Sequence, residues 1–176
     1  MNKVSDKLKC EHIKNEEEFL NFMKHIKGDL YRIAKARLLQ DEDIYDAIQE
    51  TTIISYQYIK KKKNIDNFKT WIIRVLINEC NHIYKRQKKQ VDLIKKGNLY
   101  SLESYTLIED IDSKISFDKI LSSLKYKERL IIHLYYGSRF TTKEIADILR
   151  INENTVKTKI FRVKKQIQKE IEGGNN

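Results

Sequence analysis

The stretch TTKEIADILRINENTVKTKIFRVKKQI, Thr141 to Ile167, predicts two helices separated by a tight turn. Thr141 and Glu144 have the spacing of a capping box, in which each side chain accepts a hydrogen bond from the other residue's backbone N–H, so we expect a helix to begin there. Asn152 is suited to cap the second helix. Arg150 occupies the turn position at which Gly is common, because Gly tolerates a positive φ best. We therefore expect a helix-turn-helix whose turn costs some stability.

The second of these helices has two different faces when successive residues are placed about 100° apart. Its apolar stripe consists of Val156, Ile160, Val163 and Ile167. Its polar face consists of Asn154, Lys157, Thr158, Phe161, Arg162 and Lys165. Amide and hydroxyl groups reach base edges, and Arg and Lys also bind phosphates, so this face predicts DNA binding. Phe161 suits either a thymine methyl group or a neighbouring helix. The alternative is a basic helix face that is merely solvated.

The composition agrees with a helical protein that binds a polyanion. The 176 residues carry a formal net charge of +10, from 35 Lys and Arg against 25 Asp and Glu, which favours nucleic acid first and an acidic membrane surface second. The chain has no Pro and five Gly, so helix breakers are scarce. The N-terminus is too polar for a signal peptide, and no apolar run is long enough to span a membrane. We therefore expect an all-α, cytoplasmic protein without membrane insertion.

Helical periodicity divides the chain into two small helical domains joined by a linker. In the N-terminal half we expect helices through about Leu39, from about Asp43 to Lys60, and from about Phe68 to Gln90. The pattern then weakens into an acidic, serine-containing segment with Gly97, which predicts a linker. The expected divisions are an N-terminal extension (1–15), a first domain (16–90), a linker (91–116), a second domain with its helix-turn-helix at about 141–165 (117–171), and a tail (172–176).

The third helix of the first domain places an aromatic ring among polar groups. Its apolar face runs from Ile72 to Tyr84, and the opposite face holds Trp71, Arg74, Asn78, His82 and Lys85. Aromatic side chains beside cations are suited to unpaired bases, which stack on them whatever their sequence. The alternative is that Trp71 fills a gap against another helix.

The second helix carries an acidic face that is unexpected in a basic protein. The stretch DEDIYDAIQETT, Asp41 to Thr52, places acids and amides on one side, with Ile53 among them. A small apolar centre with a polar rim is typical of a protein contact, and this one would repel DNA. The alternative is again a solvated helix face.

Three segments, in this order and at this spacing, resemble sigma factors of the extracytoplasmic-function (ECF) class, the small two-domain subunits of bacterial RNA polymerase. DEDIYDAIQETTIISYQYI is similar to the family's core-binding segment. FKTWIIRVLINECNHIYKR is similar to its promoter-melting helix, and the stretch from Thr141 to Ile167 is similar to its C-terminal helix-turn-helix. The resemblance covers about residues 18–169. It implies an alternative sigma factor that binds core RNA polymerase, recognises −35 and −10 promoter elements and initiates transcription, with no catalytic residue and no cofactor.

The resemblance also implies partners for each surface. Asp46, Gln49 and Glu50, with Ile53 beside them, match the segment that docks on the clamp coiled coil of the polymerase β′ subunit. The second domain is expected at the β flap, and an anti-sigma factor is expected to cover the polar faces. The helix that opens and holds the −10 element matches Lys69, Trp71, Arg74 and Asn78, and His82 lies in the same row. The loop 61–67 matches the position that captures a flipped −10 base.

The −35 element is expected on the polar face of the last helix. The residues that match are Asn154, Lys157, Thr158, Phe161 and Arg162, and Lys165 extends the same face. Three positions depart from the family pattern: Tyr45 stands where an acid is frequent, Thr52 where Phe is usual, and Arg150 where the turn commonly has Gly. The docking face is therefore expected to differ locally. Residues 1–15 match no part of the family.

Other functions fit fewer of these features. A homodimeric helix-turn-helix regulator would explain the C-terminal half but neither Trp71 nor the acidic face. A metal-dependent nuclease needs acids and histidines that converge on one site, and the four histidines are scattered. A membrane-surface protein would have more uniformly basic amphipathic helices. Cys10 and His12 lack a second pair of ligands, so no metal site is expected, and Cys80 is expected to be a buried thiol.

Overall fold

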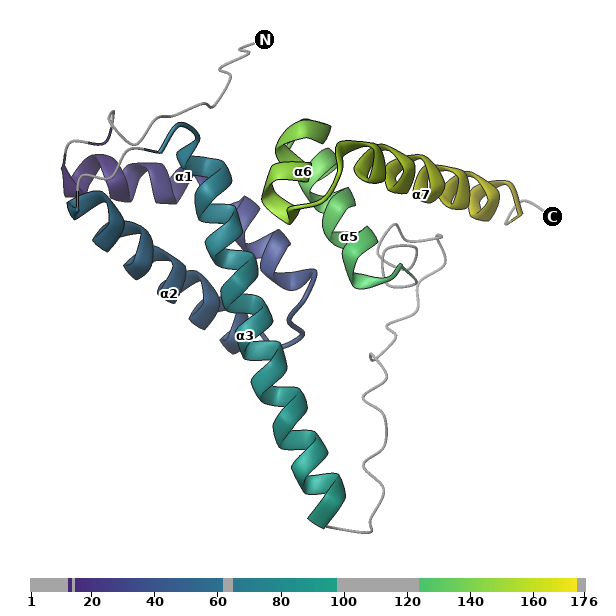
Figure 1. The fold of residues 1–176 in the computed structure, drawn as a ribbon, viewed down its shortest axis with the longest axis horizontal. Coiled ribbons are helices and arrows are strands. Elements are labelled where there is room, and N and C mark those ends of the chain that lie inside the picture. The colour runs from purple at the N-terminus through teal and green to yellow at the C-terminus, as the bar shows by residue number, and fades with distance from the viewer. Residues whose placement is uncertain (1–12, 14, 62–64, 98–123, 174–176) are drawn as a thin grey trace.

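The computed structural model describes residue 13 and residues 15–61, 65–97 and 124–173, and helices make up most of these ranges (Figure 1). No β-strand occurs within them, so the expected all-α fold is confirmed. Most of the N-terminal extension, residues 98–116 of the predicted linker and the start of the predicted second domain lie outside the described residues. The described helices form an N-terminal and a C-terminal group on either side of that gap.

The N-terminal domain contains α1 (Glu16–Lys35), α2 (Asp41–Lys60) and α3 (Phe68–Gly97). Helix α1 begins where Asn15 Oδ1 accepts a hydrogen bond from the Glu18 backbone N–H at 2.8 Å, and three Glu in its first turn complement the helix dipole. It ends four residues before the predicted Leu39. The chain leaves the helix at Ala36, and this turn places the Leu38 side chain in the core, where it is 2% exposed.

The three helices enclose an apolar core of side chains at helical spacing. The largest of these buried residues are Phe19, Leu30, Ile33, Ile44, Phe68, Ile72, Ile73 and Leu76. Removing one such side chain from water contributes about 1.5–3 kcal/mol to stability. This core therefore fixes the outward directions of the polar residues on α2 and α3.

Helix α3 continues seven residues beyond its predicted end at Gln90, so the prediction that the linker begins at residue 91 was wrong. Residues 91–96, VDLIKK, include a Leu and two Lys, which are strong helix formers, and no helix breaker occurs before Gly97. The weakening apolar pattern that suggested a linker has a different cause. This end of α3 extends past the other helices of its domain, so no neighbouring core requires an apolar stripe (Figure 1).

The C-terminal domain contains α5 (Tyr126–Ile132), the π-helical turn η2 (His133–Gly137), α6 (Thr142–Leu149) and α7 (Glu153–Gly173). The π-helical turn ends at Gly137 and is followed by the cap residue Ser138. The capping box is confirmed. The Glu144 N–H donates to Thr141 Oγ1 at 3.2 Å, and the Thr141 N–H donates to Glu144 Oε2 at 2.9 Å.

The turn between α6 and α7 is left-handed at Arg150, as the sequence predicts. Its φ of 52° and ψ of 49° lie in the region that favours glycine, and the following Ile151 N–H donates to the Ala146 carbonyl at 3.1 Å. Arg139, before α6, also has a positive φ, of 56°. The short helix α6 is therefore bracketed by two arginines in an unfavourable backbone conformation.

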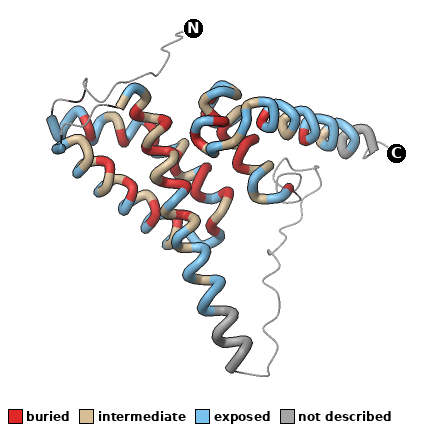
Figure 2. Tube along the Cα trace, in the orientation of Figure 1, coloured by how far each residue is buried: buried red, intermediate tan, exposed pale blue. Residues whose placement is uncertain are grey.

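The two domains pack against each other, with α6 against α3 and η2 against α1 (Figure 1). Figure 2 shows buried residues running through α1 to α3 and continuing into α5 and α6. The outer part of α7 and the far end of the described side chains of α3 are mostly exposed (Figure 2). The domains thus share one core, although the sequence predicts two separate ones.

Candidate nucleic-acid and protein interfaces

The first candidate surface is the α7 face, which consists of Asn154, Lys157, Thr158, Phe161, Arg162 and Lys165. All six residues are exposed, and Val156 and Val163 on the opposite side are buried. Phe161 leaves 66% of its surface in contact with solvent. It therefore does not pack against a neighbouring helix, which was one of the two alternatives for it. The α7 face is accessible along its full length.

Contacts at the start of α7 fix this face relative to α6. Asn152 Oδ1 accepts a hydrogen bond from the Asn154 backbone N–H at 2.8 Å, as expected of a cap. The Thr142 hydroxyl donates to Glu153 Oε1 at 2.6 Å, and Lys157 pairs with the same oxygen at 3.0 Å. The hydrogen bond from Thr142, followed by Lys157, lowers the pKa of Glu153. The recognition end of α7 is thus held by α6 through side chains as well as the turn.

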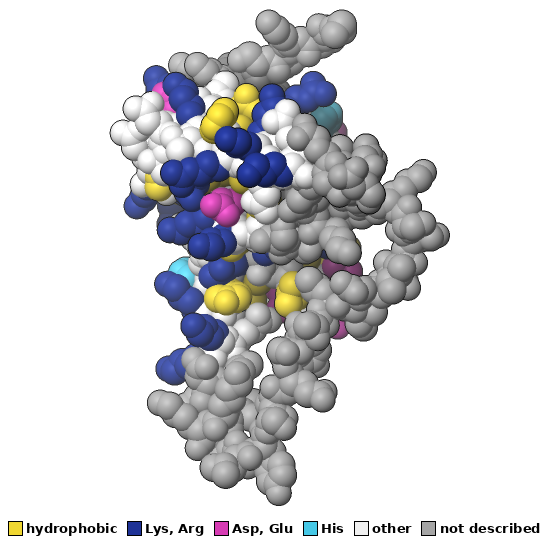
Figure 3. Space-filling view, turned by 90° about the vertical axis from the view of Figure 1, so that its right-hand side faces the viewer, with side chains coloured by type: hydrophobic (Ala, Val, Ile, Leu, Met, Phe, Trp, Pro, Cys, Tyr) yellow, Lys and Arg dark blue, Asp and Glu magenta, His cyan; other side chains and the backbone are white. Residues whose placement is uncertain are grey.

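The surface around α7 is strongly basic. Figure 3 views the molecule from the end at which α7 projects, and Lys and Arg side chains there greatly outnumber Asp and Glu. Such a surface attracts a phosphate backbone and makes binding dependent on salt concentration. The geometry and the charge of this side of the molecule both fit duplex DNA.

The second candidate surface is the α3 face, which consists of Lys69, Trp71, Arg74, Asn78 and His82. It is less open than the sequence suggests, since only Asn78 and His82 are exposed. Lys69 pairs with Asp29 of α1 at 3.2 Å, and its side chain is 12% exposed. Arg74 donates through Nη2 to the Asp147 carbonyl of α6 at 2.8 Å. The C-terminal domain and α1 therefore engage part of the row that was expected to face DNA.

Trp71 is half-buried and belongs to an aromatic cluster. Its ring lies nearly parallel to that of Phe68, with centroids 5.9 Å apart, and 4.5 Å from that of Tyr58. The alternative in which Trp71 packs against another helix is thus realised in part. The rest of the side chain is partly exposed. Asn67, just before α3, accepts a hydrogen bond at Oδ1 from the Thr70 N–H at 3.1 Å. It thereby fixes where the loop 61–67 ends.

The third candidate surface is the α2 face, which consists of Asp46, Gln49, Glu50 and Ile53. All four residues are exposed, with Ile53 at 43%. The buried side of the helix is formed by Ile44, Ala47, Thr51 and Ser55. The arrangement is a small apolar centre surrounded by acids and an amide, as the sequence predicts. It is suited to a basic protein surface and not to DNA.

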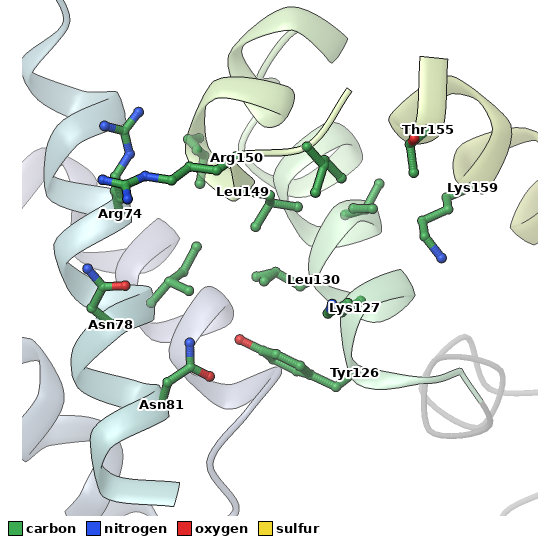
Figure 4. Close-up of a pocket in the computed structure, with 14 residues that line it drawn as sticks. Arg74, Asn78, Asn81, Tyr126, Lys127, Leu130, Leu149, Arg150, Thr155 and Lys159 are labelled. Atoms are coloured by element: carbon green, nitrogen blue, oxygen red, sulfur yellow. The ribbon is translucent and has the colours of Figure 1, made fainter. Parts of the chain in front are cut away.

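A cavity of about 370 Å³ lies between the domains (Figure 4). Its apolar wall includes residues of α5 and α6, such as Leu130 and Leu149, and amide side chains of α3 line the other side. Arg74 and Arg150 come from opposite domains and both line it, and Arg150 extends toward α3 (Figure 4). Two cations at one cavity disfavour each other unless an anion or water separates them.

A group of residues at the domain boundary was not predicted from the sequence. The Arg37 guanidinium lies 3.6 Å from the Tyr84 ring centroid and 4.2 Å from that of Tyr126. Beside them, burial raises the pKa of the Tyr126 hydroxyl to about 12 and that of the Cys80 thiol to about 12. Cys80 is thus the buried thiol expected. The contact of Arg37 with the two tyrosine rings could not be predicted from a local sequence pattern, because the three residues lie in separate segments of the chain.

Within the described ranges, no three His, Cys, Asp or Glu residues are grouped so as to hold a metal ion. Among the helices in the same ranges, none is both long and apolar enough to cross a membrane.

Comparison with known proteins assigns both domains. The family model for sigma-70 region 2 matches residues 22–90, and that for sigma-70 region 4 matches residues 114–167. The chain belongs to the ECF class of sigma-70 family sigma factors. It is an alternative sigma factor, a regulatory initiation factor that directs RNA polymerase to promoters.

Curated relatives and solved structures agree with this assignment. The sigma factor SigV of Bacillus subtilis is 26% identical over 146 residues, covering 79% of this chain and 82% of SigV. The ECF sigma factor SigW of the same organism is 25% identical over 171 residues, covering 89% and 90%. The fold is similar to that of the sigma factor RpoE in its complex with the anti-sigma factor NepR from Bartonella quintana. Their TM-score is 0.67 at 20% identity, with 89% of this chain and 98% of RpoE covered.

Proposed function

We propose that this sigma factor docks on core RNA polymerase through the α2 face. The supporting observation is that Asp46, Gln49 and Glu50 are all exposed around Ile53, while the rest of the molecule is basic. This segment is similar to the one that binds the β′ clamp coiled coil in the family. A basic surface on that coiled coil would complement the acids, and Ile53 would fill its apolar centre. The C-terminal domain would rest on the β flap.

Promoter recognition is divided between the other two surfaces. The α7 face would read the −35 element in the major groove, because its amide, hydroxyl and guanidinium groups are exposed at the start and middle of the helix. The α3 face would hold the opened −10 strand, with Trp71 as a stacking platform and the loop 61–67 near a flipped base. Because the two domains are linked, two contacts that are weak individually would together bind the promoter tightly.

An anti-sigma factor is the third partner that we propose. RpoE has been solved with the anti-sigma factor NepR, and another similar structure is that of CnrH with the cytosolic domain of CnrY (TM-score 0.63, 16% identity, 93% of this chain and 95% of CnrH covered). The residues that would face polymerase and DNA in this chain are polar and accessible on α2 and α7. A protein that covers them would prevent initiation.

The docking proposal is tested by reversing one charge. Asp46→Lys replaces an exposed acid in the polar rim of the α2 face, so we expect association with core polymerase to be lost while the helical content stays unchanged. Glu17→Lys makes the same change in charge on exposed α1 and serves as the matched control. Co-purification with core polymerase measures the association of each variant. Wild-type association by Asp46→Lys, or equal loss in both variants, would contradict docking through the α2 face.

A further inference from the structure

The cavity between the domains has the size of a small-molecule binding site. Its volume is about 370 Å³, and sites that hold small molecules in proteins measure about 300–1,000 Å³. Helix α3 forms one side of it, and α5, α6 and the start of α7 form the other (Figure 4). A molecule bound there would therefore contact residues of both domains.

One part of the cavity wall is hydrocarbon. Leu130 and Ile131 of α5 and Ile148 of α6 are at most 3% exposed, and all three border the cavity. Leu149 and Ile151, on either side of the turn between α6 and α7, also line it and are half-buried. An apolar group placed against these side chains would be removed from water and would gain dispersion contacts with them.

The charged side chains of the lining all have the same sign. No Asp or Glu occurs among the described residues that border the cavity. The cations there are Arg74, Lys127, Arg150 and Lys159. Like charges raise one another's energy, and they do so most where little water separates them. An anion in the cavity would relieve this repulsion.

Two of these cations are already engaged, and two are not. Lys159 pairs with Glu128 at 3.5 Å, and Arg74 Nη2 donates to the Asp147 carbonyl at 2.8 Å. Within the described ranges, the side chains of Arg150 and Lys127 form no ion pair. The buried Nε of Arg74 also has no hydrogen-bond partner among the described residues. Donors for an anionic group are thus present in both domains.

Neutral polar groups gather on the α3 side of the cavity. Asn78 and Asn81 of α3 line it, and the Tyr126 hydroxyl is directed toward α3 (Figure 4). A few convergent polar groups beside an apolar wall are typical of sites that hold a small molecule in one orientation. The cavity therefore has a polar side and a hydrocarbon side, and it suits a ligand with the same division.

We propose that this cavity binds a small amphipathic anion, whose carboxylate or phosphate group is held by Arg150 and Lys127 and whose apolar body packs against Leu130 and Leu149. A neutral apolar molecule would leave the cations uncompensated, and an inorganic anion would leave the hydrocarbon wall without a partner. A metal cation would be repelled. The proposal rests on neither polymerase docking nor promoter recognition.

Isothermal titration calorimetry on the full-length protein tests the proposal with four probes. Decanoate and decyl phosphate, used below their micelle concentrations, carry the two anionic groups on the same hydrocarbon chain. Decan-1-ol has the chain without the charge, and inorganic phosphate has the charge without the chain. The comparison of decanoate with decyl phosphate distinguishes a carboxylate ligand from a phosphate ester.

Two pairs of variants place the binding in the cavity. Arg150→Gly removes a cation of the lining, and Arg139→Gly is its matched control, because Arg139 has a similar positive φ but does not line the cavity. Lys127→Ala removes a second cation. Its control is Lys125→Ala, because Lys125 is exposed on the same segment and lies outside the lining. Circular dichroism checks that all four variants keep their helical content.

We expect one equivalent of decanoate or decyl phosphate to bind per chain, about tenfold more tightly than decan-1-ol or inorganic phosphate. Arg150→Gly should weaken this binding about tenfold, the effect of losing one hydrogen bond to a charged group. Lys127→Ala should weaken it less, and both controls should bind as the wild type does. The absence of saturable binding by either amphipathic anion would overturn the proposal. So would equal affinity for decan-1-ol or inorganic phosphate, or equal weakening by Arg150→Gly and Arg139→Gly.

Discussion

The helices α3 and α7 both carry polar rows that we propose as nucleic-acid contacts, but the protein supports the two helices differently. Helix α3 is packed by α1 and α2 on one side and by the C-terminal domain on the other, so its polar row is partly engaged. Helix α7 is held mainly through its first turns by α6 and α5, and the rest projects into solvent (Figure 2). A helix that must enter a major groove benefits from such projection. A helix that must hold an opened strand needs a rigid base and can be covered until it is required.

The largest expected difference between the two helices is in their contribution to stability. Leu76 of α3 is fully buried in the core shared by the domains, so Leu76→Ala should cost about 2–5 kcal/mol of unfolding free energy. Val163 of α7 belongs to a small cluster with Leu124 and Ile132, and Val163→Ala should cost about 1–2 kcal/mol. Urea unfolding followed by circular dichroism measures both. Equal costs would show that α7 is anchored as firmly as α3.

The second difference concerns the form of DNA that each helix binds. In the complex with polymerase, Trp71→Ala should weaken binding of the opened strand by about 1–3 kcal/mol, the contribution of one stacked base. Arg162→Ala should instead remove about 1–3 kcal/mol of discrimination at one −35 base pair, provided the guanidinium reads a base edge. Competition with single-strand and duplex promoter fragments separates the two effects. Uniform weakening on every duplex by Arg162→Ala would indicate a phosphate contact instead.

The third difference is in the response to alkaline pH. Burial of Cys80, a residue of α3, raises the pKa of its thiol to about 12, from an ordinary value of 9.0. The folded protein therefore holds this proton more tightly than the unfolded chain, and the contribution is complete below about pH 9 and lost as the pH rises toward 12. The unfolding free energy should fall by up to about 1.4 kcal/mol per pH unit in this window. Cys80→Ala should reduce that slope, and an unchanged slope would show that Cys80 does not cause it.

The smallest expected effects are at the two left-handed arginines that bracket α6. Arg150→Gly and Arg139→Gly should each change stability by only about 1 kcal/mol or less, because relief of the positive φ is offset by the greater freedom of Gly in the unfolded chain. Arg150 also lines the interdomain cavity, so its replacement removes a repulsion with Arg74 that Arg139→Gly leaves in place. Thermal unfolding should therefore rank Arg150→Gly as the more stable variant. The reverse order would mean that Arg150 stabilises the packing of the two domains against each other.

Local features of this fold were predictable from the sequence, because interactions between residues close together in the chain determine them. The capping box at Thr141, the left-handed Arg150 and the two-sided α7 all follow from spacing and backbone preference. The extension of α3 to Gly97 was missed, since a helix end that extends past the other helices of its domain needs no apolar pattern. The contact between the domains was missed for another reason. It joins residues such as Arg37 and Tyr126 that are far apart in the chain, and no local pattern encodes that pairing.

Transcription in vitro tests the central claim most directly. Core RNA polymerase would be given fragmented genomic DNA with and without this protein, and new transcript start sites would be mapped. We predict discrete new start sites that disappear with Asp46→Lys and Trp71→Ala, and that share sequence upstream at −35 and −10. The absence of any new start site, together with specific duplex binding by the protein alone, would contradict the proposed mechanism and favour a helix-turn-helix regulator that acts without docking on polymerase.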